Sequence, residues 1–456
     1  MKTLEAPRPS PAATGRKVEA PSPAAATLGA PAARLHYIDW LRVLAVLLLF
    51  PFHTLRVFNA DDPFYVKAAH QSVPVSYLLN FISVWHMPLL FVLAGASTFF
   101  ALGKRSSRQY LGERRTRLLV PFVFGLFVLI PPQTWYGGRF NSGYTGSFWH
   151  YLVSGDFLKW NIKDGGDYYG GFGLGHLWFI WALFLIALVT VPLLAWGRTE
   201  RGGALMRRFS RRLAHPAGWA LAALLLFIGD AIHDPTGLRL CYYLVLFVLG
   251  YAIVCGPEFM DNALRYRLPA LTVGVGLAVL SVATYGLYDS LPNASPRQIG
   301  FTLIHMLATW LVIVGLLGFG KRYLDHTSPA LSYLGEASYP VYIIHQTVIV
   351  IAAWFIVGLA ASEPLQWFTL LVVSVAVTFA LYEVVRRFAP TRFLFGMKPL
   401  KSQAAGRVAG RAGASLSTPA TPSVASPSTA THSSAAVRST PAVRSSGAVR
   451  SSTAGK

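Results

Sequence analysis

The chain has 456 residues, of which 54% are hydrophobic and only 13% are charged. Because soluble globular domains usually carry about 25% charged residues, this composition excludes an ordinary soluble protein and indicates a membrane protein. The net charge of +21 would otherwise suggest a nucleic-acid partner. The charges, however, lie in short segments between apolar runs and in two polar tails, which is the membrane pattern. We therefore expect a lipid bilayer as partner and no nucleic acid.

Two polar tails flank the apolar part of the chain. Residues 1–34 are rich in Ala and Pro and hold no apolar stretch of the kind a signal peptide needs. Residues 401–456 are basic and rich in Ser, Thr, Ala and Pro, a composition that cannot form a packed core. We predict disorder in both tails and a single membrane domain at residues 35–400. Contact of the second tail with anionic lipid is the alternative to a merely flexible segment.

Ten apolar runs between the tails approach the ~20 residues that a helix needs to cross a bilayer. They lie at about residues 37–58, 76–101, 118–136, 176–196, 217–232, 240–255, 268–287, 301–319, 337–359 and 366–385. The fifth and sixth are the shortest. The runs lack the alternating pattern of barrel strands, so we predict an all-α, polytopic membrane bundle of about ten transmembrane helices.

The basic residues between the runs predict the orientation of this bundle. In a ten-helix arrangement, connections on the side of the N-terminus carry 20 Lys and Arg residues, whereas those on the opposite side carry six. Loops rich in Lys and Arg stay in the cytoplasm. We therefore predict that both termini are cytoplasmic.

The longest predicted outer loop, at residues 137–175, is rich in aromatic side chains and carboxylates. Its members include Trp149, His150, Asp156, Trp160, Asp164, Asp167, Tyr168 and Tyr169. Aromatic rings beside scattered carboxylates suit contact with carbohydrate. The alternative is an ordinary loop at the membrane interface, where aromatic residues are common.

Ionisable residues inside apolar runs are the candidates for chemistry, because their burial in a membrane is costly. The first run carries Asp39, Arg42, His53 and Arg56. Arg42 and His53 are eleven residues apart, so on a regular helix they lie on one face, about 20° from eclipsed and about 16 Å apart along the axis. An imidazole suits proton abstraction from a hydroxyl near neutral pH, and a guanidinium suits a phosphate or a carbonyl. The alternative for His53 is a hydrogen-bonded packing residue.

Other polar residues within the runs are His86, His176, His305, His345 and Glu383. Each of them alone is more often structural than catalytic. These histidines have no Cys or carboxylate at ligand spacing, and no His-Glu-x-x-His motif occurs, so we predict no metal site. The basic segment Arg114–Arg117 satisfies the rule for cytoplasmic loops and also suits the phosphates of a nucleotide-bearing donor.

Several motifs resemble the acyltransferase-3 family of bacterial membrane acyltransferases. In that family an Arg or Lys and a His separated by ten residues mark the first helix, and Arg42 and His53 match this spacing. Arg114 and Arg117 match the family's Arg-x-x-Arg pattern, and the stretch from Ser338 to His345 is similar to its terminal helix signature. The resemblance covers about residues 35–400.

One branch of the family, the glucans biosynthesis protein C type, is more similar than others. The segments that carry this likeness are Phe50-Pro51-Phe52-His53, His86-Met87-Pro88, His176-Leu177-Trp178-Phe179 and the ending from Arg392 to Pro399. That branch transfers succinyl groups to periplasmic glucans.

The resemblance implies a multi-pass enzyme of the bacterial inner membrane that moves a succinyl or acetyl group from cytoplasmic acyl-CoA to a hydroxyl of an extracytoplasmic glycan. Acyl-CoA would be a substrate, with no bound cofactor. The phosphates of the donor would be held by Arg42, Arg114 and Arg117, and His53 would be the general base. By the same resemblance His345 is a catalytic candidate that either assists or only packs. Substrate-binding roles fall to the residues His86, His176 and Trp178.

Two other classes of function compete with the acyltransferase. A transporter or flippase for an acylated glycan or lipid is the first, although no discontinuous-helix repeat relates the two halves of the chain. A non-catalytic membrane scaffold is the second. The placement of Arg42 and His53 on one face favours the enzyme.

Overall fold

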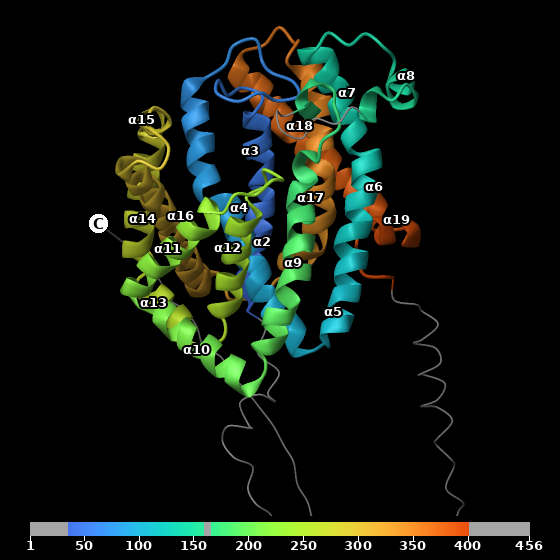
Figure 1. Ribbon diagram of the computed structural model, residues 1–456. Helices are drawn as coiled ribbons and strands as arrows, with labels where there is room; N and C mark the ends of the chain where they lie inside the picture. The colour runs from blue at the N-terminus through green and yellow to red at the C-terminus, as the bar shows by residue number, and fades with distance from the viewer. Residues whose placement is uncertain (1–34, 159–165, 401–456) are drawn as a thin grey trace, which may run out of the picture. The chain divides into compact units, whose positions relative to one another are not determined.

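The computed structural model describes residues 35–158 and 166–400, and within these ranges the chain forms helices and loops and no strand (Figure 1). Among them an isolated bridge joins Asn59 and Ser72. Both predicted disordered tails, and Trp160 and Asp164 of the predicted outer loop, lie outside the described residues.

The order of the helices follows the apolar runs. The helices are α2 (His36–Leu47), α3 (Leu49–Leu55), α4 (Val73–Gly103), α5 (Ser107–Arg114), α6 (Val120–Val128), α7 (Ile130–Asn141), α8 (Phe148–Val153), α9 (Trp178–Trp196), α10 (Glu200–Ala214), α11 (Pro216–Ala231), α12 (Leu240–Ala252), α13 (Glu258–Arg265), α14 (Arg267–Ala283), α15 (Tyr285–Asp289), α16 (Pro296–Tyr323), α17 (Pro329–Ile356), α18 (Glu363–Val385) and α19 (Ala389–Leu394). A π-helical turn, η1 (Arg115–Leu119), joins α5 to α6, and a 3-10 turn, η4 (Gly175–Leu177), precedes α9.

Seven helical segments of the described chain are long and apolar enough to cross a membrane, and two bent helix pairs raise this number to as many as nine. The seven are His36–Leu55, Val73–Gly103, Ser107–Asn141, Gly175–Trp196, Pro296–Tyr323, Pro329–Ile356 and Glu363–Val385. The bent pairs are α10 with α11, at 109°, and α13 with α14, at 73°. The predicted all-α, polytopic membrane bundle is confirmed, and the chain is a multi-pass membrane protein.

The fifth and sixth apolar runs form a short hairpin. Helix α11 has 16 residues and α12 has 13, which correspond to about 24 Å and 20 Å of length, less than the ~30 Å of a bilayer core. Figure 1 shows the loop between them at mid-height in the bundle, well below the upper ends of α4 and α17. The flanking helices α10 and α13 both lie in the lower part of the bundle (Figure 1).

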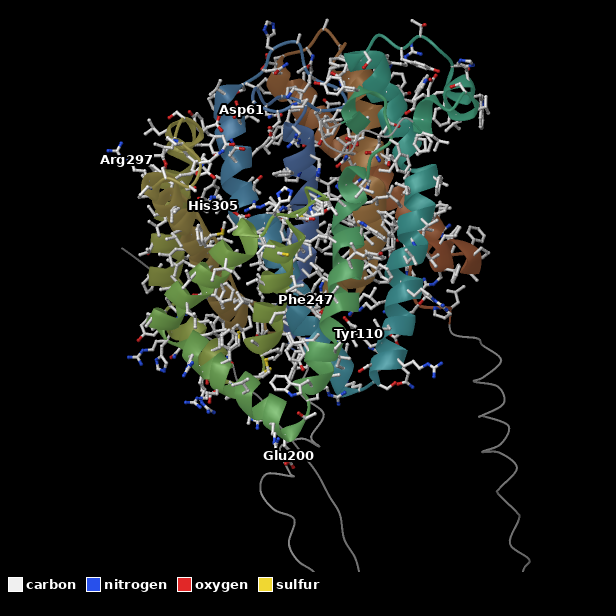
Figure 2. The ribbon with its side chains drawn as sticks, in the orientation of Figure 1. Asp61, Tyr110, Glu200, Phe247, Arg297 and His305 are labelled. Carbon is white, nitrogen blue, oxygen red and sulfur yellow. The ribbon has the colours of Figure 1, made fainter. Side chains whose placement is uncertain are left out.

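Two segments that the sequence presents as basic loops are helical. Residues 200–214 form α10, whose arginines are exposed while Gly202, Met206 and Ser210 face the bundle. Arg114 ends α5 and Arg117 lies in the π-turn η1, so the Arg-x-x-Arg segment belongs to a nearly continuous helix from Ser107 to Asn141. Glu200 lies at the lower end of the bundle, whereas Asp61 and Arg297 lie near its upper end (Figure 2).

Helices α4 and α12 approach each other backbone to backbone. A Cβ atom added to Gly95 of α4 would overlap the carbonyl oxygen of Phe247 in α12, and one added to Gly250 would overlap the carbonyl oxygen of Val92. Small residues allow such close approach between helices in a membrane. This contact fixes the hairpin against α4.

Candidate functional site

A cavity of about 760 Å³ opens in the upper half of the bundle. It is lined by Leu49, Phe52, His53, Arg56, Phe64, His86, Met87, Asp167, Tyr168, Gly173, Leu174, Gly175, His176, Trp178, the hairpin loop from His233 to Leu238, Tyr342 and Gln346. The lining is apolar and aromatic with a few converging polar groups, which is the usual character of a ligand site. Four of its side chains are histidines, three of them from separate membrane-spanning segments.

A proline places His53 at the wall of this cavity. Pro51 has no N–H to donate to the carbonyl four residues earlier, and the helix is interrupted at Leu48, between α2 and α3. The short helix α3 then carries His53 in its last turn. Phe52 packs beside it, with its ring centroid 5.2 Å from that of His53.

His53 contacts a second histidine, His345, from α17. The Nε2 atom of His345 lies 3.3 Å from Nδ1 of His53, and the two ring centroids are 5.0 Å apart. His345 itself is fully buried and lies behind His53, outside the cavity lining. The ring of His176 is 5.2 Å from that of His345 on another side. Three imidazoles from α3, α17 and η4 therefore meet at one point of the bundle.

Backbone carbonyls assign the proton on each of these rings, because a carbonyl oxygen can only accept a hydrogen bond. His345 donates from Nδ1 to Tyr342 O at 2.6 Å, which leaves its Nε2 as an acceptor. His53 Nδ1 lies 3.1 Å from Leu49 O and donates to that oxygen and toward His345 Nε2. In neutral His53 the unprotonated nitrogen is therefore Nε2, which is the form a general base requires.

His176 and His86 are fixed in the same way. His176 donates from Nε2 to Ile343 O at 2.9 Å, and the Tyr342 hydroxyl donates to His176 O. The Nδ1 atom of His176 is buried with no partner among the described residues. His86 donates from Nε2 to Ala45 O at 2.7 Å and so ties α4 to α2. Both rings keep an unprotonated Nδ1; that of His176 is buried, whereas that of His86 can accept a hydrogen bond from a ligand.

Trp178 lines the cavity, and Tyr243 and Phe91 lie against it. The ring of Trp178 lies 5.3 Å from that of Tyr243 and 6.3 Å from that of Phe91. Both pairs are tilted, and the indole of Trp178 has an apolar face and a polar N–H edge. The cavity thus combines hydrogen-bonding imidazoles with an aromatic platform.

Two carboxylates of the cavity are engaged within the protein. Asp167 accepts a hydrogen bond of 2.5 Å from the Tyr65 hydroxyl, and burial raises the pKa of this carboxyl above its ordinary value. Asp234 accepts from the backbone and hydroxyl of Thr236 and from Leu240 N, which shapes the hairpin loop. Both acids therefore hold loops in place.

The three arginines predicted to hold a donor are not among the residues of the cavity. Arg42 bonds to Asp39 at 3.0 Å and to Ser97 at 2.5 Å, so it joins α2 to α4. The Arg114 guanidinium lies 4.7 Å from the ring centroid of Tyr110. An open hollow of about 510 Å³ next to α5 is lined by Lys104, Arg105, Gln109, Gly112, Glu113 and Thr116. The hollow beside α5 and the histidine-lined cavity thus share no lining residue.

The predicted histidines and Trp178 do come together. The residues His53, His86, His176 and Trp178 line one cavity, with His345 directly behind. Sequence reasoning did not assign Arg56 or the hairpin loop to the site. Arg56 could have been suspected, because it follows His53 by one helical turn. Among the described residues no group of three His, Cys, Asp or Glu side chains is arranged to hold a metal ion.

Comparisons with known proteins find the same family that the sequence motifs resemble. A family model described as an acyltransferase domain, the acyltransferase-3 family, matches residues 35–383. Proteins named glucans biosynthesis protein C from Salmonella agona and Salmonella heidelberg are each 22% identical over 393 residues, which cover 81% of this chain and 96% of the relative. No solved structure matches the chain.

Proposed function

The chain belongs to the acyltransferase-3 family and is a membrane acyltransferase, and from this premise we propose that it moves an acyl group from cytoplasmic acyl-CoA to a hydroxyl of an extracytoplasmic glycan in the bacterial inner membrane. The observation that carries the proposal is the assigned tautomer of His53, whose Nε2 is a free base at the cavity. The name of the relatives, which refers to glucans, supports a glycan as acceptor.

The reaction requires one proton transfer and one exchange of bonds at the acyl carbon. The acceptor hydroxyl gives its proton to Nε2 of His53 as its oxygen bonds to the thioester carbonyl carbon. The carbon–sulfur bond then breaks, and the thiolate of CoA takes the proton back from the imidazolium. The positive charge on His53 in between is shared with His345 through Nδ1. The acyl group thus passes directly from the sulfur of CoA to the acceptor oxygen, with no covalent acyl-enzyme.

The two substrates reach this point from opposite ends. We assign the sugar to the upper cavity, which His176 lines, where Trp178 offers an aromatic face and the unprotonated Nδ1 of His86 accepts a hydrogen bond from a hydroxyl. We assign the phosphates of CoA to the basic lower end, which holds Arg114, Arg117 and the hollow beside α5. Guanidinium groups bind phosphate through charge-assisted hydrogen bonds.

The proposal is tested by acyl transfer in inverted membrane vesicles. Acetyl-CoA and succinyl-CoA, each labelled in the acyl group, are supplied outside the vesicles, which is the former cytoplasmic side. We expect label on glycan inside the vesicles that contain the protein and none in vesicles without it. Label that stays on CoA with every donor and with a glucan acceptor loaded inside would refute the proposal.

A second expected result concerns His345 as a positioning residue for His53. Replacing His345 with alanine removes one of the two acceptors of the His53 Nδ1–H group and leaves only Leu49 O. We expect kcat to fall about 10²-fold, the cost of misplacing a catalytic group, with KM nearly unchanged. His345→Gln keeps an acceptor oxygen and should recover most of the loss. Equal kcat in the alanine variant and the wild type would exclude this role, and so would a glutamine variant as slow as the alanine variant.

A further inference from the structure

Gln346 is a polar residue of the cavity wall that the proposed reaction does not use. It follows His345 in α17, so its Cα lies about 1.5 Å further along the helix axis. His345 lies 3.3 Å from His53, and Gln346 therefore leaves its helix near the height of the proposed base. Tyr342, one turn earlier, lines the same cavity, as expected for residues four apart on one helical face.

Hydrogen bonds behind the wall fix the orientation of the Gln346 amide. Gln133 of α7 donates from Nε2 to the carbonyl oxygen of Leu129 at 2.9 Å and to Thr347 Oγ1 at 2.8 Å. Because a carbonyl oxygen only accepts, this atom of Gln133 is its nitrogen, and the other end of its amide is an acceptor. Gln346 donates from Nε2 to that acceptor, Gln133 Oε1, at 3.0 Å. The nitrogen of the Gln346 amide therefore faces Gln133, and its oxygen is left for another partner.

The Oε1 atom of Gln346 is open to the cavity. Among the described residues no group donates to it, yet it is not enclosed by the protein, unlike Nδ1 of His176. The residue as a whole is only 3% exposed and lines the cavity, so the accessible part of its amide belongs to that space. Exchange of the two amide ends would place an oxygen against Gln133 Oε1. Oε1 of Gln346 is therefore a hydrogen-bond acceptor held in a fixed position.

Two imidazoles of the cavity wall have the same polarity. His53 donates from Nδ1 to Leu49 O, and His86 donates from Nε2 to Ala45 O, so each ring keeps an unprotonated nitrogen for the cavity. Three side chains, from α3, α4 and α17, thus use an N–H within the wall and present an acceptor to a ligand. A ligand that pairs with all three carries several hydroxyl groups.

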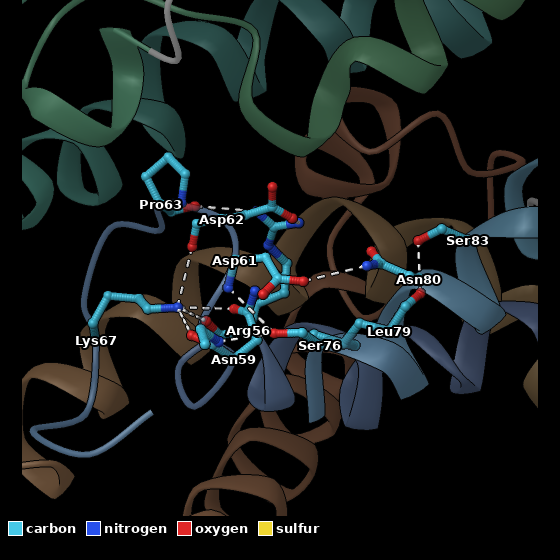
Figure 3. Close-up of polar contacts among 11 residues, drawn as sticks. Arg56, Asn59, Asp61, Asp62, Pro63, Lys67, Ser76, Leu79, Asn80 and Ser83 are labelled. Atoms are coloured by element: carbon cyan, nitrogen blue, oxygen red, sulfur yellow. Dashed lines mark hydrogen bonds and ion pairs between the residues drawn. The ribbon is translucent and has the colours of Figure 1, made fainter. Parts of the chain in front are cut away.

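The cations at the upper rim of the cavity are bonded to the loop that follows α3 (Figure 3). Arg56 donates from Nη2 to Pro63 O at 3.0 Å, and its Nε is buried. The ammonium of Lys67 donates to the carbonyl oxygens of Arg56 and Asp62, both at 3.1 Å, and to Oδ1 of Asn59 at 2.8 Å. These bonds fix the rim, so the three acceptors face a space of fixed shape.

We propose that Gln346 accepts a hydrogen bond from the hydroxyl next to the one that is acylated, and so restricts the acceptor to sugars with two neighbouring free hydroxyls. The inference rests on the function proposed above. His53 takes the proton of the reacting hydroxyl, and Oε1 of Gln346 is the acceptor for its neighbour at nearly the same height. A site that hydrogen-bonds a substrate hydroxyl rejects an analogue without it, because its own polar group is then left unpaired. An ester oxygen cannot donate either, so a sugar already acylated at the neighbouring carbon is a poor acceptor.

The test compares acceptors that differ in one hydroxyl. They are the smallest gluco-oligosaccharide that the wild type acylates and the analogues that each lack one hydroxyl of the acylated sugar, loaded inside inverted vesicles. We expect loss of the neighbouring hydroxyl to lower the wild-type kcat/KM by about 5- to 100-fold, chiefly through the KM of the acceptor. Gln346→Met has a side chain of similar length without an amide oxygen, and should use the parent sugar and this analogue equally within about threefold. Its kcat/KM for the analogue should at least match that of the wild type, which also shows that the variant is folded.

The control is Gln366→Met. Gln366 also lies in a membrane-spanning helix, but its amide donates to the carbonyl oxygens of Val357 and Leu359 and it does not line the cavity, so this variant should keep the wild-type preference. A wild type that uses all analogues with the reacting hydroxyl as well as the parent would overturn the inference and leave the proposed function intact. So would a Gln346→Met enzyme that keeps the preference, or one that is slower with all acceptors alike. A wild type that acylates no glucan of any length would remove the proposed function and the inference together.

Discussion

Replacing His53 with alanine is expected to lower acyl transfer by about 10²- to 10⁴-fold, the usual contribution of a general base. The variant keeps the helix break at Leu48 but removes the imidazole. In wild type the Nδ1 atom of this imidazole carries the proton and donates to Leu49 O and toward His345, so its Nε2 is unprotonated. Because the proton of the acceptor hydroxyl then has no base to accept it, kcat should carry the loss and the KM for acyl-CoA should change little. Initial rates of labelled acyl transfer in vesicles measure both constants.

The matched control for this experiment is His305→Ala. His305 is also a histidine within a membrane-spanning helix, but its Nδ1 is paired with Ser281 Oγ at 2.9 Å and it does not line the cavity. Figure 2 shows it on the side of the bundle formed by α14 and α16. We expect transfer by this variant to match the wild type. A His53→Ala enzyme that works as well as His305→Ala would remove His53 from the mechanism.

The second large effect is expected on folding, from Gly95→Ala. The added methyl group would overlap the carbonyl oxygen of Phe247 and lie 2.9 Å from Tyr251 N. These are backbone atoms of α12 and cannot rotate away, so the two helices must separate. Overpacking costs typically about 1–3 kcal/mol, and here it also displaces the hairpin that lines the cavity. We expect a lower yield of monodisperse protein after detergent extraction and a lower Tm.

Gly103→Ala provides the comparison on the same helix. A Cβ atom at Gly103 meets nothing within 4 Å, so this variant should extract and melt like the wild type, and the alanine itself favours the helix. If Gly95→Ala were as stable as Gly103→Ala, the close contact between α4 and α12 would not support the fold.

The class of the fold follows from the sequence because hydrophobic length is a direct physical requirement of the bilayer. All ten apolar runs fall in helices. What the runs do not specify is whether two short helices cross the membrane or turn back within it. That choice depends on tertiary contacts such as the one between Gly95 and Phe247, which join residues far apart in the chain.

The sequence predicted only part of the site, because contacts between residues far apart in the chain have no local sequence signal. Helical periodicity predicts Arg42 and His53 on one face of the segment His36–Leu55. In the structure Arg42 is bonded to Asp39 and Ser97 and does not line the cavity. The pairing of His53 with His345 spans 292 residues and has no local signal in the sequence. Arg56 was among the ionisable residues of the first run but received no role, because a basic residue at a helix end resembles an ordinary interfacial anchor.

The mid-height position of the hairpin loop limits how much of the bilayer separates the two substrates. Non-helical backbone at such depth is compatible with a membrane only where it lines a water-filled space. The cavity is lined by the loop from His233 to Leu238, which lies at mid-height in the bundle (Figure 1), so less than the full height of the bundle separates the two substrates. In the proposed reaction the thioester end of CoA reaches the cavity from the lower end and only the acyl group passes on to the acceptor. Neither the nucleotide nor the sugar then has to cross the membrane, and group transfer takes the place of transport.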